Sequence, residues 1–224
     1  MRKLLYIVLF LSVGKHLQAT NYNCHTEAGQ LQSLIGEQHR TITNLTVSGT
    51  IDVRDFAFIN DSLFHLAGIA DCTIDAFESR DIYLGNQTRF DANCIPANTF
   101  FGFQELTTVR LPRNTEKIGK GAFAGCTKLK NIDWGNNLQE IAGFAFCDCF
   151  SLNTSLPQTL EKIGEYAFKQ CISFTGIDLS LSVLRSIGNQ AFLNCTALSS
   201  ITLPASLQSI GKECFAGCSS LTGI

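Results

Sequence analysis

The chain has 224 residues, of which 45% are hydrophobic and only 16% are charged. Intrinsic disorder needs low hydrophobicity and high charge, so this composition excludes a disordered chain. The 17 Lys and Arg residues against 19 Asp and Glu residues give a net charge of −2. The chain therefore lacks the basic surplus that a nucleic-acid partner requires, and no such partner is expected.

The N-terminus has the pattern of a secretory signal. Met1–Lys3 is positively charged, and Leu4–Val13 is a run of 10 residues that are apolar apart from Ser12. This run is too short to cross a bilayer core of ~30 Å as a helix, but it suits the apolar region of a signal peptide. We predict a signal peptide over residues 1–19 and an exported protein, secreted or at the cell surface, without a transmembrane segment after signal removal. The alternative is a buried N-terminal strand.

Residues 20–94 are less regular than the rest of the chain. Leu45 and Val47 alternate as in a strand, and Gly49 is interpreted as a turn. Asp52 or Asp55 can then cap a helix, because apolar residues follow at helical spacing at Val53, Phe56, Ile59, Leu63 and Leu66. We predict that the segment is an N-terminal cap made from a degenerate repeat, whose polar outer side prevents self-association of the stack.

From residue 95 the chain repeats itself every 22 to 24 residues, in units that begin at Ile95, Ile118, Ile141, Ile163, Ile187 and Ile210. The sixth place of every unit is Phe, at Phe100, Phe123, Phe146, Phe168, Phe192 and Phe215. The ninth place is Phe103 in the first unit and Cys in the other five, at Cys126, Cys149, Cys171, Cys195 and Cys218. A fixed period of 20–30 residues is typical of a solenoid, in which neighbouring units bury each other's apolar side chains.

The pattern changes within each unit. Ile187, Ala191 and Cys195 are four residues apart and share one side of a short helical or 3₁₀ segment. Ile201 and Leu203 are two apart, as in a strand, and the Pro that follows ends the strand. We predict one strand, one turn and one short helix or 3₁₀ segment per unit of about 23 residues. The Phe side chains are expected to stack through a continuous core.

The repeat reads I-G-x-x-A-F-x-x-C-x-x-L-x-x-I-x-L-P and resembles the BspA-like leucine-rich repeat of bacterial surface proteins. The resemblance covers residues 95–224 strongly and extends more weakly upstream, where Ile42–Phe56 looks like the family's N-terminal segment. It implies an α/β-type leucine-rich-repeat solenoid and a role in adhesion, through attachment to host matrix proteins or other bacteria.

Three irregularities interrupt the pattern. The third unit lacks a residue around Asn153–Ser155, and the fourth has an extra residue near Val183 and lacks the Pro, so local strand register is open there. The sixth unit is incomplete, because Leu221–Ile224 stops inside its strand portion. We expect that the chain is a fragment of a longer array or that a partner covers this end.

The ten cysteines fall into two groups. The five at the ninth place of the units are expected to be buried free thiols, because Cys behaves there as a small apolar group. A disulfide between Cys72 and Cys94 would close one loop in the cap. The pairing of the others stays open, and they are Cys24, Cys147 and Cys214.

No catalytic residue, metal site or cofactor is predicted. The chain contains no P-loop, G-x-S-x-G, H-E-x-x-H or dinucleotide-binding motif. Cys147-x-Cys149 and Cys214-x-x-x-Cys218 look like halves of a zinc site, but a tetrahedral site needs four convergent ligands. One member of each pair faces the core, and no His follows His65. We therefore expect that the protein is not an enzyme.

Binding is the function class that the pattern favours, because the outward strand positions of a solenoid line an extended concave face. Trp134 takes a Leu place and is predicted to lie in the core. We predict an exported, non-enzymatic protein-binding or adhesion module; the alternative is a structural spacer or the truncated remnant of a longer repeat surface protein. The candidate protein-binding face consists of Thr108, Arg110, Asn131, Asp133, Ser155, Gly176, Asp178, Ser200 and Thr202.

Overall fold

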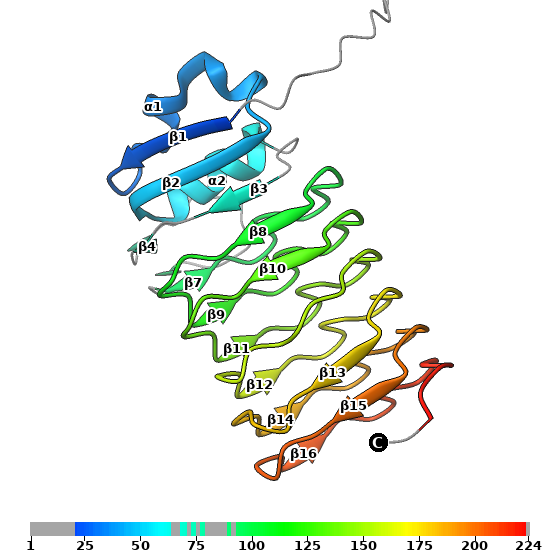
Figure 1. The fold of residues 1–224 in the computed structure, drawn as a ribbon. Coiled ribbons are helices and arrows are strands. Elements are labelled where there is room, and N and C mark those ends of the chain that lie inside the picture. The colour runs from blue at the N-terminus through cyan, green and yellow to red at the C-terminus, as the bar shows by residue number, and fades with distance from the viewer. Residues whose placement is uncertain are drawn as a thin grey trace, which may run out of the picture.

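The computed structural model describes residues 21–63, 68–70, 73–74, 77–78, 89–90 and 93–222. Short parallel strands stack turn upon turn along the molecule to form a solenoid, as predicted (Figure 1). Among the residues described, no helix has the length and apolar composition needed to span a bilayer. The predicted signal peptide lies outside the described residues.

The repeats contain two series of strands, where the sequence predicted one strand per unit. The first series holds the Ile that begins each unit, and its six parallel strands form one sheet: β7 (Cys94–Ile95), β9 (Lys117–Ile118), β11 (Glu140–Ile141), β12 (Lys162–Ile163), β14 (Ser186–Ile187) and β16 (Ser209–Ile210). The second series holds the predicted strands: β8 (Thr108–Arg110), β10 (Asn131–Asp133), β13 (Gly176–Asp178) and β15 (Ser200–Thr202). The single-strand prediction was wrong, because the Ile places also pair edge to edge with the same places in the next unit.

The predicted helical or 3₁₀ segment is a chain of consecutive turns. Its fourth and eighth places have positive φ in every repeat, so the backbone cannot continue as a right-handed helix. The backbone N–H of the Phe at the sixth place instead donates to the carbonyl of the fifth residue of the next unit, at 2.7–2.9 Å in five successive pairs. These bonds form a third ladder along the side that we call the turn face: residues 96–104, 119–127, 142–150, 164–172, 188–196 and 211–219.

The core is a stack of Phe rings that runs through all six repeats. Neighbouring rings lie 4.8–5.5 Å apart between centroids, with interplanar angles of 3–12°. Each buried ring contributes roughly 1.5–3 kcal/mol to folding. Five of the six are fully buried, and Phe215 is half-buried.

Each cysteine at the ninth place lies beside this stack. Its thiol donates to the carbonyl of the Phe in the preceding repeat, with S···O distances of 3.0–3.2 Å. The sequence predicted only that the Cys at the ninth place acts as a small apolar side chain. It is also a hydrogen-bond donor between repeats. All five thiols are free and buried.

The N-terminal part extends the sheet that contains β8 and β10 of the second strand series. The strand order in this sheet is β1 (Asn21–Thr26), β2 (Asn44–Ile51), β3 (Gly68–Ala70), β8 and β10. Asn21 pairs with Asn44 and Asn44 with Gly68, which are shifts of 23 and 24 residues. The spacing of the repeats thus extends into this part. The remaining strands are β4 (Thr73–Ile74), which pairs with β2, and β5 (Phe77–Glu78), which pairs antiparallel with β6 (Arg89–Phe90).

Helices replace the turns in the N-terminal part: α1 (Leu31–Ile35), a 3₁₀ helix (Gly36–Arg40) and α2 (Val53–Ser62). Asp52 is the N-cap of α2 and forms a capping box with Asp55, so Asp52 is the cap of the two that were considered. Gly49 lies inside β2 and is not a turn. Its φ of 94° and the carbonyl of Thr26, which a side chain would meet, explain the Gly. The role of residues 20–94 as a cap stays a prediction.

Candidate binding face

The residues predicted to bind a partner lie on one exposed surface. Thr108 pairs with Asn131 and Arg110 with Asp133 across β8 and β10. Gly176 pairs with Ser200 and Asp178 with Thr202 across β13 and β15. All of these residues are exposed, whereas the middle residue of each three-residue strand faces the core. We call this surface, together with Ser155, the strand face.

Three charged side chains mark the strand face. The Nε of Arg110 lies 3.3 Å from Oδ2 of Asp133, and both side chains are more than half exposed. Asp133 and Asp178 also accept backbone N–H groups two residues later, from Gly135 at 3.2 Å and Ser180 at 2.9 Å. The bonds from Ser180 hold the pKa of Asp178 below its usual value. Both carboxylates thus fix the turns that follow their strands while they remain accessible to a partner.

The strand face is interrupted in the third repeat, where the sequence lacks a residue. No strand forms there among the described residues, so β10 and β13 belong to separate sheets. Trp134 bridges the interruption, since its Nε1 donates to the carbonyl oxygen of Ser155 at 2.7 Å. The indole is only 6% exposed and packs edge to face on Phe146, with 5.5 Å between centroids. Trp134 lies in the core, where the pattern predicted it.

A hollow of about 440 Å³ opens at this interruption. Asp133 and Ser155 of the strand face line it, and Trp134 forms part of its wall. The other lining residues include Asn136, Gln158 and Thr159 from the turns that follow. The sequence did not predict this hollow; its signal was the missing residue, which we interpreted only as uncertainty in strand register.

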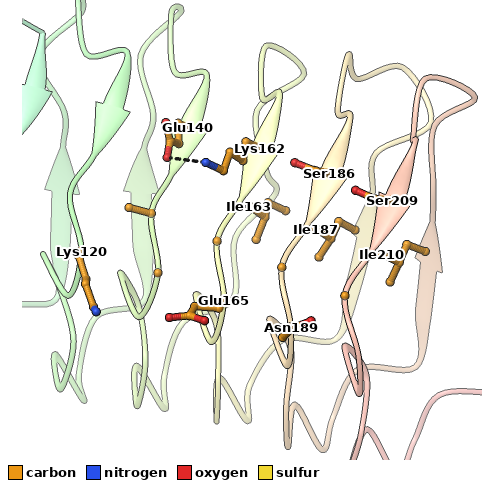
Figure 2. Close-up of a pocket in the computed structure, with 15 residues that line it drawn as sticks. Lys120, Glu140, Lys162, Ile163, Glu165, Ser186, Ile187, Asn189, Ser209 and Ile210 are labelled. Carbon is orange, nitrogen blue, oxygen red and sulfur yellow. Dashed lines mark ion pairs between the residues drawn. The ribbon is translucent and has the colours of Figure 1, made fainter.

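A second depression, of about 550 Å³, runs across the first strand series. Figure 2 shows Ile163, Ile187 and Ile210 in a row, with Glu140 and Lys162 on one side and Glu165 and Asn189 on the other. Lys162 pairs with Glu140 at 3.3 Å, as does Lys117.

Four glycines line this depression, and at three of them the backbones of successive repeats approach closely. A Cβ on Gly164, Gly188 or Gly211 would lie 2.3–2.4 Å from a backbone nitrogen of the preceding repeat. Close packing therefore accounts for the shape of the depression.

Several cysteines of the described part of the chain are buried thiols. No group of three or more His, Cys, Asp or Glu side chains gathers there. Burial raises the pKa of Cys126 to about 12 and that of Cys147 to about 11, so both thiols stay protonated at neutral pH. Cys214 is likewise buried, with its pKa raised to about 12. Cys72 lies outside the described residues, so the disulfide with Cys94 stays one open alternative.

Two solved structures with TM-scores above 0.5 agree with this fold. A leucine-rich repeat protein from Bacteroides ovatus is 30% identical, with a TM-score of 0.53, over 61% of this chain and 36% of that chain. One from Eubacterium ventriosum is 18% identical, with a TM-score of 0.52, over 82% of this chain and 60% of that chain. A leucine rich cell surface protein from Faecalibacterium prausnitzii is 19% identical, with a TM-score of 0.42, over 82% and 38%. No curated protein sequence matches the chain.

A family model gives the assignment. The chain spans about a third of the length of the Bacteroides ovatus protein. The model of the BspA type leucine rich repeat region matches residues 93–222 in six copies, which is more than half of the chain. The predicted resemblance is confirmed, and the chain belongs to the BspA type leucine-rich repeat family.

Proposed function

We propose that the protein is an exported, non-enzymatic module that binds a protein partner through the strand face. The observation that carries the proposal is the alignment of outward-facing polar residues on β8, β10, β13 and β15, with the hollow at Trp134 in their midst. Repeat solenoids use such extended faces to bind other macromolecules. The charged N-terminal residues and the apolar run of 10 residues that follows support export.

The strand face offers a partner one hot-spot residue and one recess. Interface energy concentrates in Trp, Tyr and Arg side chains that dock beside pockets. Arg110 is exposed and already oriented by Asp133, and the hollow next to Asp133 has room for a side chain of the partner. The small polar residues around them contribute complementarity rather than affinity. Host matrix proteins or surface proteins of other bacteria are the partners that the family resemblance implies.

The test is binding of the purified protein to a panel of extracellular matrix proteins. We expect the combined change Arg110→Gln, Asp133→Asn and Asp178→Asn to weaken binding at least about tenfold, because it removes the charges but keeps the turn acceptors. The matched control replaces one Arg and two acids outside the strand face and both depressions: Arg185→Gln, Glu161→Gln and Glu105→Gln. The control should bind like the wild type.

Two results would contradict the proposal. If no panel protein binds, adhesion to matrix is wrong. If the triple variant binds as tightly as its control, the strand face is not the contact surface.

A further inference from the structure

A third hollow, of about 630 Å³, lies on the turn face of the first three repeats. Phe101 of the first repeat and Phe144 of the third line it, together with Lys120, Cys147 and Asp148. The second repeat contributes small lining residues, which are Gly121, Ala124 and Gly125. None of the residues assigned to the strand face lines this hollow, so binding at the hollow would be independent of binding at the strand face.

The shape of the hollow results from the order of the repeats. Successive rungs of a parallel stack are about 4.8 Å apart, so Phe101 and Phe144 lie two rungs apart. The repeat between them lines the hollow with Gly121, Ala124 and Gly125, and with Lys120. Gly121 has no side chain, so it leaves the space between the two aromatic residues open, whereas a side chain fills the same place in the other five repeats. The gap between the two aromatic residues therefore depends on Gly121, and it suits a flat group.

The aromatic residues at this hollow contribute less to the stability of the fold than buried aromatic residues would. Phe101 is 62% exposed, which forfeits the stabilisation that burial would give. Phe144 and Tyr166 have φ values of 60° and 54°, in the left-handed region that bulky residues rarely adopt. Every repeat has positive φ at this place, so the aromatic side chains, and not the backbone, distinguish these two repeats.

Packing within the repeats does not demand aromatic residues here. The corresponding place in the other four repeats is filled by Asn98, Gly121, Gln190 and Glu213. Phe144 and Tyr166 instead stack on each other at the surface, with 4.8 Å between centroids and an angle of 23°. Both are half-buried, so they extend the apolar lining of the hollow toward the fourth repeat.

Two ammonium groups border these rings. The Nζ of Lys120 lies 5.4 Å from the centroid of Phe144, and that of Lys169 lies 5.8 Å from the centroid of Tyr166. Asp148 is the carboxylate among the lining residues. The Lys120 ammonium lies at the edge of the hollow, where it would attract a carboxylate of a ligand.

We propose that the turn-face hollow is a second recognition site, which takes an aromatic side chain of a partner protein together with a neighbouring carboxylate. The ring enters above Gly121 and Ala124, between Phe101 and Phe144. The carboxylate pairs with Lys120 at the edge. Aromatic anchors with an adjacent charge are common at the centres of protein interfaces.

The test uses short peptides with an acetylated N-terminus and an amidated C-terminus: Gly-Phe-Asp-Gly, Gly-Phe-Lys-Gly and Gly-Ala-Asp-Gly. Each is titrated into the full protein up to about 5 mM, since a single anchoring side chain is expected to bind in the millimolar range. NMR follows the ring resonances of Phe101, Phe144 and Tyr166. We expect the Phe-Asp peptide to shift them and to bind more tightly than the other two.

Variants locate the site. Phe101→Ala should weaken the Phe-Asp peptide about tenfold. Phe150→Ala is the matched control, because Phe150 is an exposed Phe of the same turn face that does not line the hollow, and it should leave binding unchanged. Lys120→Gln should abolish the preference for the Phe-Asp over the Phe-Lys peptide. This variant changes an exposed side chain, so it also tests the site if Phe101→Ala lowers stability.

Three results would overturn the proposal: no shift of these resonances by the Phe-Asp peptide, equal binding by the Phe101→Ala variant and its control, or equal affinity for the Phe-Asp and Gly-Ala-Asp-Gly peptides. Sedimentation of the wild type at increasing concentration adds a fourth. A dimer that Phe101→Ala abolishes would mean that a second copy of this chain, rather than another protein, fills the hollow.

Discussion

Single cysteine side chains join one repeat to the next. The carbonyl of Phe123 accepts both the N–H of Cys126 in its own repeat, at 3.1 Å, and the thiol of Cys149 in the following one, also at 3.1 Å. A thiol is a weak donor that is also apolar enough for the core. Ala would leave this bond unmade, and Ser would bring a more polar hydroxyl into the same space. Cys meets both demands at the ninth place.

Burial makes the thiol of Cys126 unreactive in the folded protein. The pKa of Cys126 is raised from 9.0 to about 12, so we expect negligible alkylation by iodoacetamide at pH 8 and full alkylation in concentrated urea. Because the folded-state pKa lies above the unfolded value, this thiol contributes full stability below pH 9.0 and loses it as the pH rises toward 12. Mass spectrometry of the alkylated protein measures the first expectation. Equal labelling of Cys126 with and without urea would contradict it.

At the scale of the element, two left-handed residues per repeat define the turn face. The eighth place has positive φ in all six repeats and is Gly in three of them, at Gly102, Gly125 and Gly217. These glycines, with Asp148 and Asn194 at the same place, were a visible signal for turns. The spacing of Ile, Ala and Cys by four residues instead led to the prediction of a helical segment. Successive turns bring every fourth side chain to the core, as a helix does.

Gln170 fills this place in the fourth repeat with a φ of 60°. Replacing it with Gly removes the Cβ that makes the left-handed region unfavourable, so Gln170→Gly should raise the free energy of unfolding by about 0.5–1 kcal/mol. Gln170→Ala keeps the Cβ and is the control. Urea denaturation of the three proteins gives the comparison. An equal gain in the two variants would show that loss of the Gln side chain, and not backbone relief, is responsible.

At the scale of the whole molecule, each repeat contacts mainly its neighbours, so the interrupted sheet at the third repeat is a local weak point. Parallel pairing joins β8 to β10 and β13 to β15, but not β10 to β13. The indole of Trp134 supplies a bond across this junction. The first strand series and the Phe stack continue past it.

We expect amide hydrogens of residues 154–156 to exchange faster than those of Asn131–Asp133 and Gly176–Asp178, because they lie outside the strand pairing. Trp134→Phe should speed this exchange further and destabilise the protein by about 0.5–1.5 kcal/mol, since the Ser155 carbonyl loses the 2.7 Å bond from the indole and keeps only the 3.4 Å bond from the Thr154 hydroxyl. The control is Tyr22→Phe, which loses an exposed bond to the carbonyl of Leu34. Hydrogen exchange read by mass spectrometry measures the three segments. Uniform protection across them would contradict the weak point.

The sequence alone predicted the solenoid, the family and the outward positions of the strand face, because these depend on features that recur in every repeat. It did not predict the hollow at Trp134 or the one beside Phe101. Each arises where particular neighbours differ from the consensus, as when Gly121 falls between Phe101 and Phe144. Such sites require knowledge of which side chains share a rung and which lie one rung away.

The bonds between each Cys and the Phe of the preceding repeat constrain how such a protein changes length during evolution. A duplication of one complete unit brings both a thiol and a carbonyl, so every new junction is equivalent to an old one. A duplication that is out of phase with the period would separate donor from acceptor and disrupt the ring stack as well. Unequal recombination within the gene should therefore be retained in whole-repeat steps, and relatives should differ in repeat number more readily than in repeat length.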